Sequence, residues 1–328
     1  MLLDSITLKD LLSFQEATIE LRPLNVLIGP NASGKSNLIS AITLLKAAPG
    51  DLQEAIRRGG GVRQWIGKRQ PRTTAAIEAR IAVPGDARPL EYSLAFTERA
   101  SSFHIVNESL RPVVDHPGSG FLKRSAGHVR IYRTGNQAFS EAAIAESKSG
   151  LAAYRDPADP TPITRVGEAL GAIQVFREFH TDLNSTVRTG VSTMAHKDFL
   201  WEGGGNLALI LDDLRFAGKL EPLKEYLRRF WEEADDVRVK TDGPVTQTYV
   251  KERGIEEPIS AIRLSDGTLK FLCLLAALRD DTLSGAGERS LRRCGGHSGL
   301  RTRGGRRDRL QPATVRRSGR MAGALSSG

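Results

Sequence analysis

The chain has 328 residues, 40% of them hydrophobic, which is enough for one large or two ordinary domains. Its two cysteines lack metal-ligand spacing and no apolar run approaches a membrane span, so disulfide-rich, zinc-binding and membrane-spanning classes are excluded. The N-terminus lacks a secretory pattern, which predicts a cytoplasmic protein. The whole chain has 47 basic and 38 acidic residues, a net charge of +9. Residues 289–328 hold 11 Arg and one acid, so residues 1–288 hold 36 basic and 37 acidic residues and have a net charge of −1. Bulk charge therefore gives no argument that the folded part binds DNA.

The first elements predicted are short strands. Residues 1–9 and 17–21 alternate between apolar and polar side chains, which is typical of a β-hairpin. The apolar residues of segment 24–28 then predict a short buried strand.

The next segment fits the phosphate-binding pattern G-x-x-x-x-G-K-[ST] at every fixed position. Its glycines let the backbone turn N–H groups toward a polyphosphate, Lys35 supplies a point charge, and the Ser36 hydroxyl can complete a Mg²⁺ shell. Apolar residues then recur at helical spacing until Pro49, so the pattern would lie at a helix N-terminus, which favours an anion. The residues of this predicted nucleotide site are Gly29, Pro30, Asn31, Ala32, Ser33, Gly34, Lys35, Ser36 and Asn37.

A second helix is predicted over residues 52–58, where Arg57 and Arg58 precede three glycines. These arginines fit a solvated helix end, and less well a contact to phosphate. Residues 73–133 hold four β-prone runs separated by turns, which predicts an antiparallel meander. Residues 140–153 are weakly helical.

The following part is mostly helical. Residues 206–216 and 223–231 predict helices, whereas residues 171–179 fit either a strand or a helix. Two β-prone runs around residues 241–244 predict a hairpin. The histidines are scattered and show no ligand pattern.

A second motif, IRLSDGTLK, covers residues 262–270 and precedes the apolar run FLCLLAAL. Ser265 or Asp266 would cap the helix that this run predicts. A serine hydroxyl and the Gly267 amide at a helix N-terminus also form an anion site, here one that could face a γ-phosphate. The helix is apolar on all sides and is expected to be buried.

Together, NVLIGPNASGKSN and LSDGTLK resemble the ABC-type ATPase heads of the RecF, SMC and OLD group, AAA-family proteins of DNA repair, chromosome maintenance and phage defence. The resemblance runs from Met1 to about Leu278 and implies an α/β P-loop NTPase fold with a mixed sheet around the phosphate loop. The two motifs are 228 positions apart, from Ser36 to Leu264, and no heptad arms are present. A compact head like RecF or the OLD-related ATPases therefore fits better than an SMC protein or an ABC transporter subunit. The implied parts are a phosphate-loop part (1–60), a β-lobe (73–135), a helical lobe (164–235), and a hairpin with the signature helix (237–282).

The resemblance also implies the partners of the site. In that family two heads sandwich two ATP molecules, so Lys35 and Ser36 would bind phosphates and Mg²⁺ in cis, with Ser36 the metal ligand. Ser265 and Gly267, with Asp266 between them, would contact the γ-phosphate in trans. A homodimer, DNA, and a partner nuclease or repair protein are expected, and a membrane is not. The glutamine that usually links Mg²⁺ to the lobes stays open among Gln64, Gln137 and Gln174.

The catalytic acids of such a head are not found. The family pattern needs an apolar strand ending in Asp-Glu after the signature helix, and then a histidine. Glu256 and Glu257 precede the signature, and Asp280 and Asp281 end the signature helix itself. Residues 283–328 are instead rich in Arg, Gly and Ser. They are a disordered basic tail that binds nucleic acid or acidic partners, or an out-of-frame translation; the loss of the required strand at this point favours truncation or frameshift.

Three functions fit this sequence. The leading one is an ATP-dependent dimerising and hydrolysing head that works with DNA. The second is a non-hydrolysing ATP-binding module or an inactive remnant. The third, a transporter nucleotide-binding subunit, is disfavoured by the long interval between the motifs.

Sequencing the gene across codons 275–295 tests the frameshift. Another reading frame past Thr282 should encode an apolar strand ending in Asp-Glu and a later histidine. Finding only non-coding sequence there would contradict this expectation.

Overall fold

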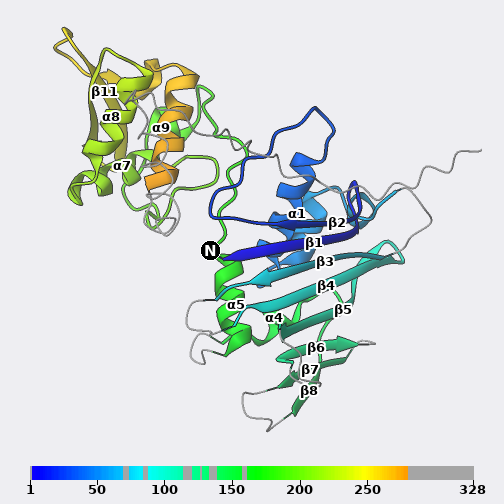
Figure 1. The fold of residues 1–328 in the computed structure, drawn as a ribbon. Helices are drawn as coiled ribbons and strands as arrows, with labels where there is room; N and C mark the ends of the chain where they lie inside the picture. Colours follow the sequence, from blue (N-terminus) through cyan, green and yellow to red (C-terminus); the bar gives the residue numbers. More distant parts are fainter. Residues whose placement is uncertain are drawn as a thin grey trace, which may run out of the picture. The chain divides into compact units, whose positions relative to one another are not determined.

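The computed structural model describes residues 2–68, 74–83, 88–113, 120–125, 128–132, 139–156 and 161–279. These residues form two compact units, which Figure 1 shows. Unit 1 runs to Ile173, and unit 2 starts at Gln174. In the described ranges, no helix combines the length and the apolar character that a membrane crossing requires.

Unit 1 is built on an eight-stranded antiparallel sheet with the strand order β2-β1-β3-β4-β5-β6-β7-β8. The N-terminal hairpin lies at one edge and the meander continues from its inner strand. The strands are β1 (Leu3–Leu11), β2 (Phe14–Glu20), β3 (Thr74–Ile81), β4 (Leu90–Arg99), β5 (Ser102–Pro112), β6 (Leu122–Ser125), β7 (His128–Tyr132) and β8 (Phe139–Ala143).

Alternation along the strands gives this sheet one buried face. Ile77 pairs with Leu8 on one side and Leu94 on the other, and all three side chains are fully buried. Helices cover that face, with α1, α4 and α5 packed on one another (Figure 1). The helices of unit 1 are α1 (Lys35–Ala47), α2 (Leu52–Arg58), α3 (Val62–Trp65), α4 (Gly150–Tyr154) and α5 (Pro162–Gly171).

A fully buried ion pair ties the sheet to α4. Glu108 on β5 accepts hydrogen bonds from the Tyr92 hydroxyl at 2.9 Å and from the Gly150 N–H at 2.7 Å. The Nε of Arg124 on β6 lies 3.6 Å from Glu108 Oε2, the oxygen that also accepts from Gly150, and neither charged side chain is exposed. Burial raises the pKa of Glu108, and the hydrogen bonds from Gly150 and Tyr92 and the charge of Arg124 oppose that rise.

Unit 2 packs helices against a second antiparallel sheet with the order β10-β11-β12, in which β9 also pairs with β11. Its core contains fully buried leucines from α7, α8 and α9 together with Val250 of β11. The elements are α6 (Thr186–Thr189), β9 (Val191–Ser192), α7 (Leu207–Phe216), α8 (Leu220–Phe230), β10 (Ala234–Asp242), β11 (Val245–Glu252), β12 (Ile259–Ser260), the 3₁₀ turn η1 (Ala261–Arg263) and α9 (Asp266–Arg279).

Most elements expected from the sequence are confirmed. The two hairpins, the meander, and the helices α1, α2, α7, α8 and α9 are present, with β6 an additional strand of the meander. α8 begins at Leu220, earlier than expected. Arg57 and Arg58 both pair with Glu54, as expected of a solvated helix end.

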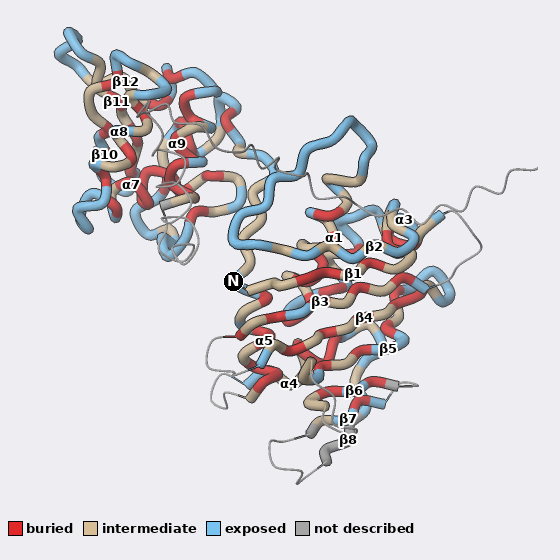
Figure 2. The backbone as a smooth tube through the Cα atoms, in the orientation of Figure 1, coloured by how far each residue is buried: buried red, intermediate tan, exposed pale blue. Residues whose placement is uncertain are grey.

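The predicted buried strand over residues 24–28 is wrong. This segment is irregular, and its apolar side chains Leu24, Val26, Leu27 and Ile28 are 57%, 72%, 48% and 91% exposed. Figure 1 shows the connection from β2 to α1 looping out beyond the sheet, and it is pale blue in Figure 2. An apolar run becomes a buried strand only where another strand pairs with it, and no described strand does so here.

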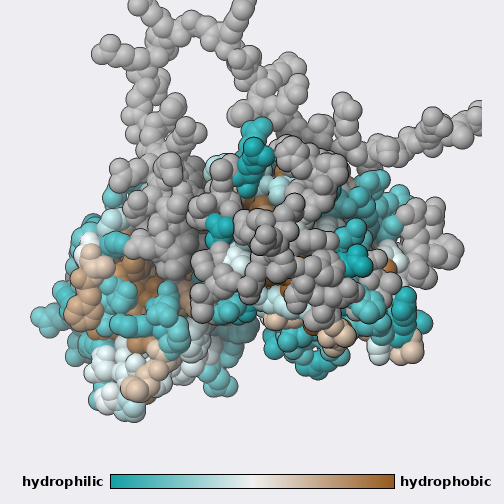
Figure 3. Space-filling model, turned by 90° about the horizontal axis from the view of Figure 1, so that it is seen from below, coloured by the Kyte–Doolittle hydropathy of each residue, from teal (hydrophilic) through white to brown (hydrophobic). Residues whose placement is uncertain are grey.

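This exposed run differs from the face of the molecule drawn in Figure 3. Most of the described surface seen in Figure 3 is hydrophilic, and the apolar patches on it lie between polar side chains. Single exposed apolar side chains are ordinary, whereas a contiguous run of them is typical of a segment that another surface covers.

The sheet of unit 1 also corrects an expectation. The sequence predicted a mixed sheet around the phosphate loop and a separate antiparallel lobe over residues 73–135. All described pairings are antiparallel, and β1 pairs with β3, so the hairpin and the meander form one sheet. Pairing between strands so far apart in sequence depends on tertiary packing, which local patterns do not encode.

Three further segments differ from expectation. Residues 140–153, expected to be weakly helical, contain part of β8 and most of α4, and residues 172–179 form neither a strand nor a helix. α5 falls in the expected helical lobe (164–235) but packs in unit 1 with α1 and α4. The expected tail over residues 283–328, with Asp280, Asp281 and Gln137, lies outside the described residues.

The buried ion pair gives a stability prediction. Arg124→Met should destabilise the protein by about 3 kcal/mol, because it leaves the buried carboxylate of Glu108 without its cation. The exposed pair of Arg111 with Glu91 is the control, and Arg111→Met should cost less than about 1 kcal/mol. Urea unfolding followed by circular dichroism measures both.

The same variant should respond to pH. Without Arg124, the pKa of Glu108 in the folded state rises further, so folding favours the protonated carboxyl. A group whose pKa is raised by folding loses its stabilising contribution as pH rises, so the Arg124→Met deficit should shrink between pH 7 and pH 5. An unchanged deficit over this range would contradict a contribution of Glu108 protonation to it.

Candidate functional site

The loop before α1 has the backbone of a phosphate-binding turn. Gly34, its last residue before the helix, has φ +97° and ψ 0°, a left-handed conformation that favours glycine. A Cβ at this position would lie 3.2 Å from the ring of Phe14, so the turn also packs closely against the tip of the β1–β2 hairpin. The conformation therefore favours glycine at position 34, and the space for a side chain there is tight.

The cation of the loop is turned onto the loop itself. Lys35 Nζ donates to the carbonyls of Gly29 and Pro30, each at 2.7 Å, and lies 3.3 Å from Ser33 Oγ. These partners belong to exposed residues, so exchanging them for a phosphate would leave no buried polar group unpaired. Lys35 therefore donates to carbonyls of its own loop and remains available to bind an anion.

The hairpin tip supplies a contact that the sequence did not indicate. Asn37 Nδ2 donates to Ser13 Oγ at 2.8 Å, which fixes the first turn of α1 to the end of β1. Ser13 and Phe14 thus contact the loop and the first turn of α1 although they precede Gly34 by about twenty residues. No single-sequence pattern predicts such a pairing, because it follows from the packing of the hairpin on α1.

The residues present fit a polyphosphate. The first N–H groups of α1 have no partner within the helix and lie at the positive end of its dipole. Lys35 adds a full charge at the same end, and Ser36 is exposed there with its hydroxyl able to coordinate Mg²⁺. Among the described residues, no group of three or more His, Cys, Asp or Glu side chains could hold a metal ion. The chain thus offers Ser36 as a metal ligand, without a carboxylate cluster in the described part.

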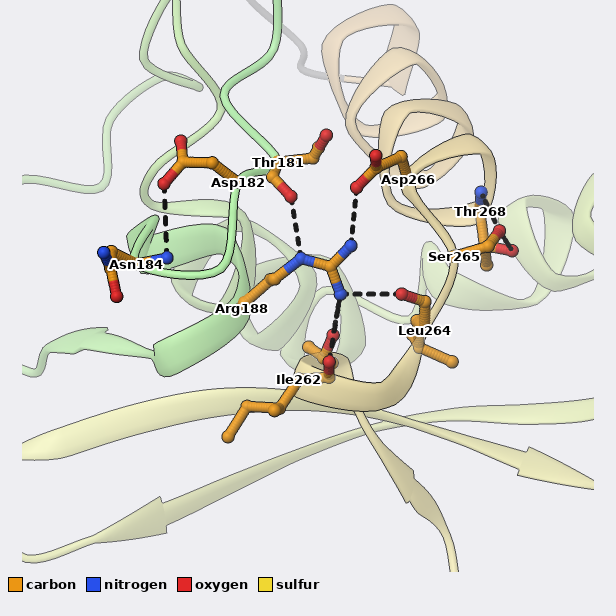
Figure 4. Close-up of polar contacts among 10 residues, drawn as sticks. Thr181, Asp182, Asn184, Arg188, Ile262, Leu264, Ser265, Asp266 and Thr268 are labelled. Atoms are coloured by element: carbon orange, nitrogen blue, oxygen red, sulfur yellow. Dashed lines mark hydrogen bonds and ion pairs between the residues drawn. The ribbon is translucent and has the colours of Figure 1, made fainter.

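The second motif forms the N-terminus of α9 in unit 2. Ser265 Oγ accepts a hydrogen bond from the Thr268 N–H at 3.1 Å, which confirms Ser265 as the helix cap (Figure 4). Ser265, Asp266 and Gly267 are exposed, while the apolar part of α9 beyond them is largely buried. The expectation that this helix is buried is therefore confirmed for its body, and its first turn faces out of unit 2.

Arg188, on α6, contacts the same turn. Its Nη2 donates to Asp266 Oδ1 at 2.6 Å, and this bond, with a smaller contribution from Thr181, lowers the pKa of Asp266. Asp266 is thus an ionised side chain at the N-terminus of α9, held to one side by a buried guanidinium (Figure 4).

An open hollow of about 390 Å³ lies beside Ser265. Trp231 and Arg263 line it together with Ser265 and Thr268. The hollow therefore combines an aromatic face, a cation and a hydroxyl, which is the chemistry that recognises nucleotides. Neither Trp231 nor Arg263 stood out in the sequence, since an aromatic residue at a helix end is ordinary packing.

The structure also places other acids and glutamines that the sequence singled out. Glu256 and Glu257 are exposed in an irregular turn between β11 and β12. Gln64 accepts a hydrogen bond from Lys68 on the surface of α3. Gln174 is the first residue of unit 2, and its Oε1 is buried without a hydrogen-bond partner among the described residues.

The thiol of Cys273 takes no part in this chemistry. It is buried in the middle of α9, and burial raises its pKa to about 12. A thiol in that state is neither a nucleophile nor a metal ligand at neutral pH.

Comparison with known proteins places both motifs in one family. The family model described as "AAA domain, putative AbiEii toxin, Type IV TA system" matches residues 24–286. The DNA replication and repair protein RecF of Gloeobacter violaceus is 39% identical over 102 residues, covering 30% of this chain and 24% of that protein. The DNA replication and repair protein RecF of Magnetococcus marinus is 31% identical over 134 residues, covering 36% and 34%. The matches thus span about a quarter and a third of these relatives.

The cap of α9 gives a prediction. Ser265→Ala should lower the free energy of unfolding by about 1 kcal/mol, because the Thr268 N–H loses its acceptor, whereas Ser265→Asp keeps a cap and should be close to neutral. Urea unfolding distinguishes the two. Equal stability of both variants with the wild type would show that this hydrogen bond does not hold the helix.

Proposed function

The chain belongs to this family of AAA domains, and on that premise we propose that it is an ATP-binding head of the RecF-like type, two copies of which pair around ATP and hydrolyse it in work on DNA. The observation that carries the proposal is the exposed first turn of α9. Ser265 and Gly267 face out of unit 2, where a ligand held by another molecule can reach them.

The two half-sites have complementary roles in this proposal. The loop before α1 takes the triphosphate through its N–H groups and Lys35. The N-terminus of α9 then contacts the terminal phosphate of the ATP held by a second copy, as in the family that the motifs resemble. Thr268 can supply the proton of its 2.9 Å hydroxyl–hydroxyl contact with Ser265, which leaves the Ser265 O–H to donate to a phosphate oxygen.

The hollow beside Ser265 supports a nucleotide at this place. Arg263 is exposed at its rim and can pair with a phosphate, and Trp231 offers an aromatic face. Gln174 has a buried oxygen without a partner among the described residues, and it stays a candidate, with Gln64 and Gln137, for the glutamine that would link Mg²⁺ to the lobes.

Hydrolysis would be an in-line attack of water on the γ-phosphate, with Lys35 and the helix N-termini stabilising the charge that develops. Such chemistry also needs a carboxylate that orients the water. The family places that carboxylate after the signature helix, which ends at the last described residue, Arg279. A second candidate is therefore an ATP-binding module that pairs without hydrolysis.

The DNA role rests on the relatives. Both curated relatives are named DNA replication and repair proteins, and the chain covers only part of each. Since residues 1–288 have a net charge of −1, DNA contact would depend on local features or on the basic residues 289–328 rather than on overall charge.

A binding experiment on the full chain tests the nucleotide step. Lys35→Ala should abolish binding of a fluorescent ATP analogue in the presence of Mg²⁺, because the loop loses its only lysine charge. Lys46→Ala, at the other end of α1, is the matched control and should bind as the wild type does. Retained binding in Lys35→Ala would contradict the proposal.

A second measurement tests the pairing. Light scattering after size exclusion should show a dimer of the wild type with Mg²⁺ and ATP. Ser265→Asp keeps the cap but adds a negative charge beside the γ-phosphate, so it should bind ATP and remain monomeric. Thr161→Asp, which alters the cap of α5 in unit 1, should still dimerise.

Phosphate release separates the two candidates. Dimerisation with phosphate release supports the ATPase, and dimerisation without it supports the non-hydrolysing module. A wild type that binds ATP and stays monomeric rules out both forms of the pairing.

A further inference from the structure

Arg188 is a buried cation whose bonds end on the loop that precedes α9. It lies on α6, and its side chain is 7% exposed. Burying a guanidinium is costly unless its donors are paired. Here the partners are concentrated in one short segment of unit 2.

The guanidinium donates to three carbonyls of that segment. Nη1 donates to Leu264 O at 2.6 Å and to Ala261 O and Ile262 O, each at 3.1 Å (Figure 4). These carbonyls belong to the turn η1 and to the link before Ser265. Ala261 O also accepts from the Leu264 N–H at 3.3 Å within the turn, so Arg188 adds to the backbone pairing that holds this segment.

Both the side chain and the backbone of Arg188 are held by other residues of unit 2. Its Nε donates to Thr181 O at 2.7 Å, and its backbone carbonyl accepts from Gln247 Nε2 at 2.7 Å. Gly190, two residues further on, has φ +96°, and a Cβ there would lie 2.9 Å from Thr246 O, so the end of α6 is packed closely against β11. The guanidinium therefore reaches the loop from a rigid support.

The remaining donor, Nη2, compensates the negative charge of Asp266. Asp266 is an acid one position after Ser265, and an unpaired carboxylate there would repel an incoming phosphate. Nη2 of Arg188 holds Asp266 Oδ1 at 2.6 Å and compensates its charge. Helix N-termini tolerate an acid, but a site for a phosphate anion needs that acid neutralised.

From these contacts we propose that Arg188 is the positioning residue of the signature turn: it fixes the loop of residues 261–264 and neutralises Asp266, so that Ser265 and Gly267 are presented to the phosphate of a second copy. The proposal rests on the function proposed above, and it assigns to α6 a part in ATP-dependent pairing.

Dimerisation of the full chain tests the proposal. Arg188→Met should weaken the ATP-dependent dimer by about 10- to 100-fold, the effect of losing one charged hydrogen-bonding group, while ATP affinity stays within about twofold. Arg228→Met is the matched control, because Arg228 also donates to a backbone carbonyl of unit 2, at Asp235, away from this loop. Sedimentation at several protein concentrations gives the dissociation constants.

A double variant distinguishes positioning from a merely structural role. Asp266→Asn removes the uncompensated charge, so Arg188→Met with Asp266→Asn should dimerise more tightly than Arg188→Met alone. Loss of structure alone would not be repaired by removing a second partner of the network. A double variant that is weaker than Arg188→Met, or an Arg188→Met protein that dimerises like the wild type, would overturn the proposal.

Hydrogen exchange gives a readout that does not need ATP. In the monomer, Arg188→Lys keeps the charge and most of the stem but cannot bond to the carbonyls and Asp266 at once. Amide exchange of residues 262–269 should therefore speed up about tenfold, while the body of α7 is unchanged. Unchanged exchange in this segment would overturn the positioning role of Arg188, whether or not the wild type dimerises. A wild type that fails to dimerise would overturn the proposed function instead.

Discussion

Unpaired N–H groups at the starts of two helices are the constraint on which the site depends. The first turn of a helix has donors without intrahelical acceptors and a positive end of the dipole. α1 meets this constraint with a glycine-bounded loop, and α9 meets it with the Ser265 cap and an exposed turn. Both solutions leave donors for an anion, and a triphosphate is long enough to use two such ends.

The two ends manage their cations differently. Lys35 is flexible and bonds to carbonyls of exposed residues, so it can change partners when an anion arrives. Arg188 is buried and divided among five acceptors, so it cannot leave without exposing unpaired groups. In the proposed pairing, Lys35 adapts to the ligand, whereas Arg188 holds a preformed turn.

Local patterns predicted the parts of the site that depend on a few neighbouring residues. The phosphate-binding pattern, the helix after it and the cap of α9 all follow from spacing within about ten residues, and they are present. Arg188 could not be found this way, because its acid partner is 78 residues away. The joining of the hairpin to the meander through β1 and β3, and the exposure of residues 24–28, likewise depend on which strands meet in space.

The exposed run of Leu24, Val26, Leu27 and Ile28 has a thermodynamic consequence for the loop that it enters. Covering such side chains is worth about 1.5–3 kcal/mol each when burial is complete. A surface that covered them would also hold the chain leading into Gly29 in place, and so lower the ordering entropy that phosphate binding must overcome. Covering of the run and filling of the loop are therefore linked equilibria. A partner that binds to the run would therefore raise the affinity of the loop for a nucleotide, and the nucleotide would raise the affinity for that partner by the same factor.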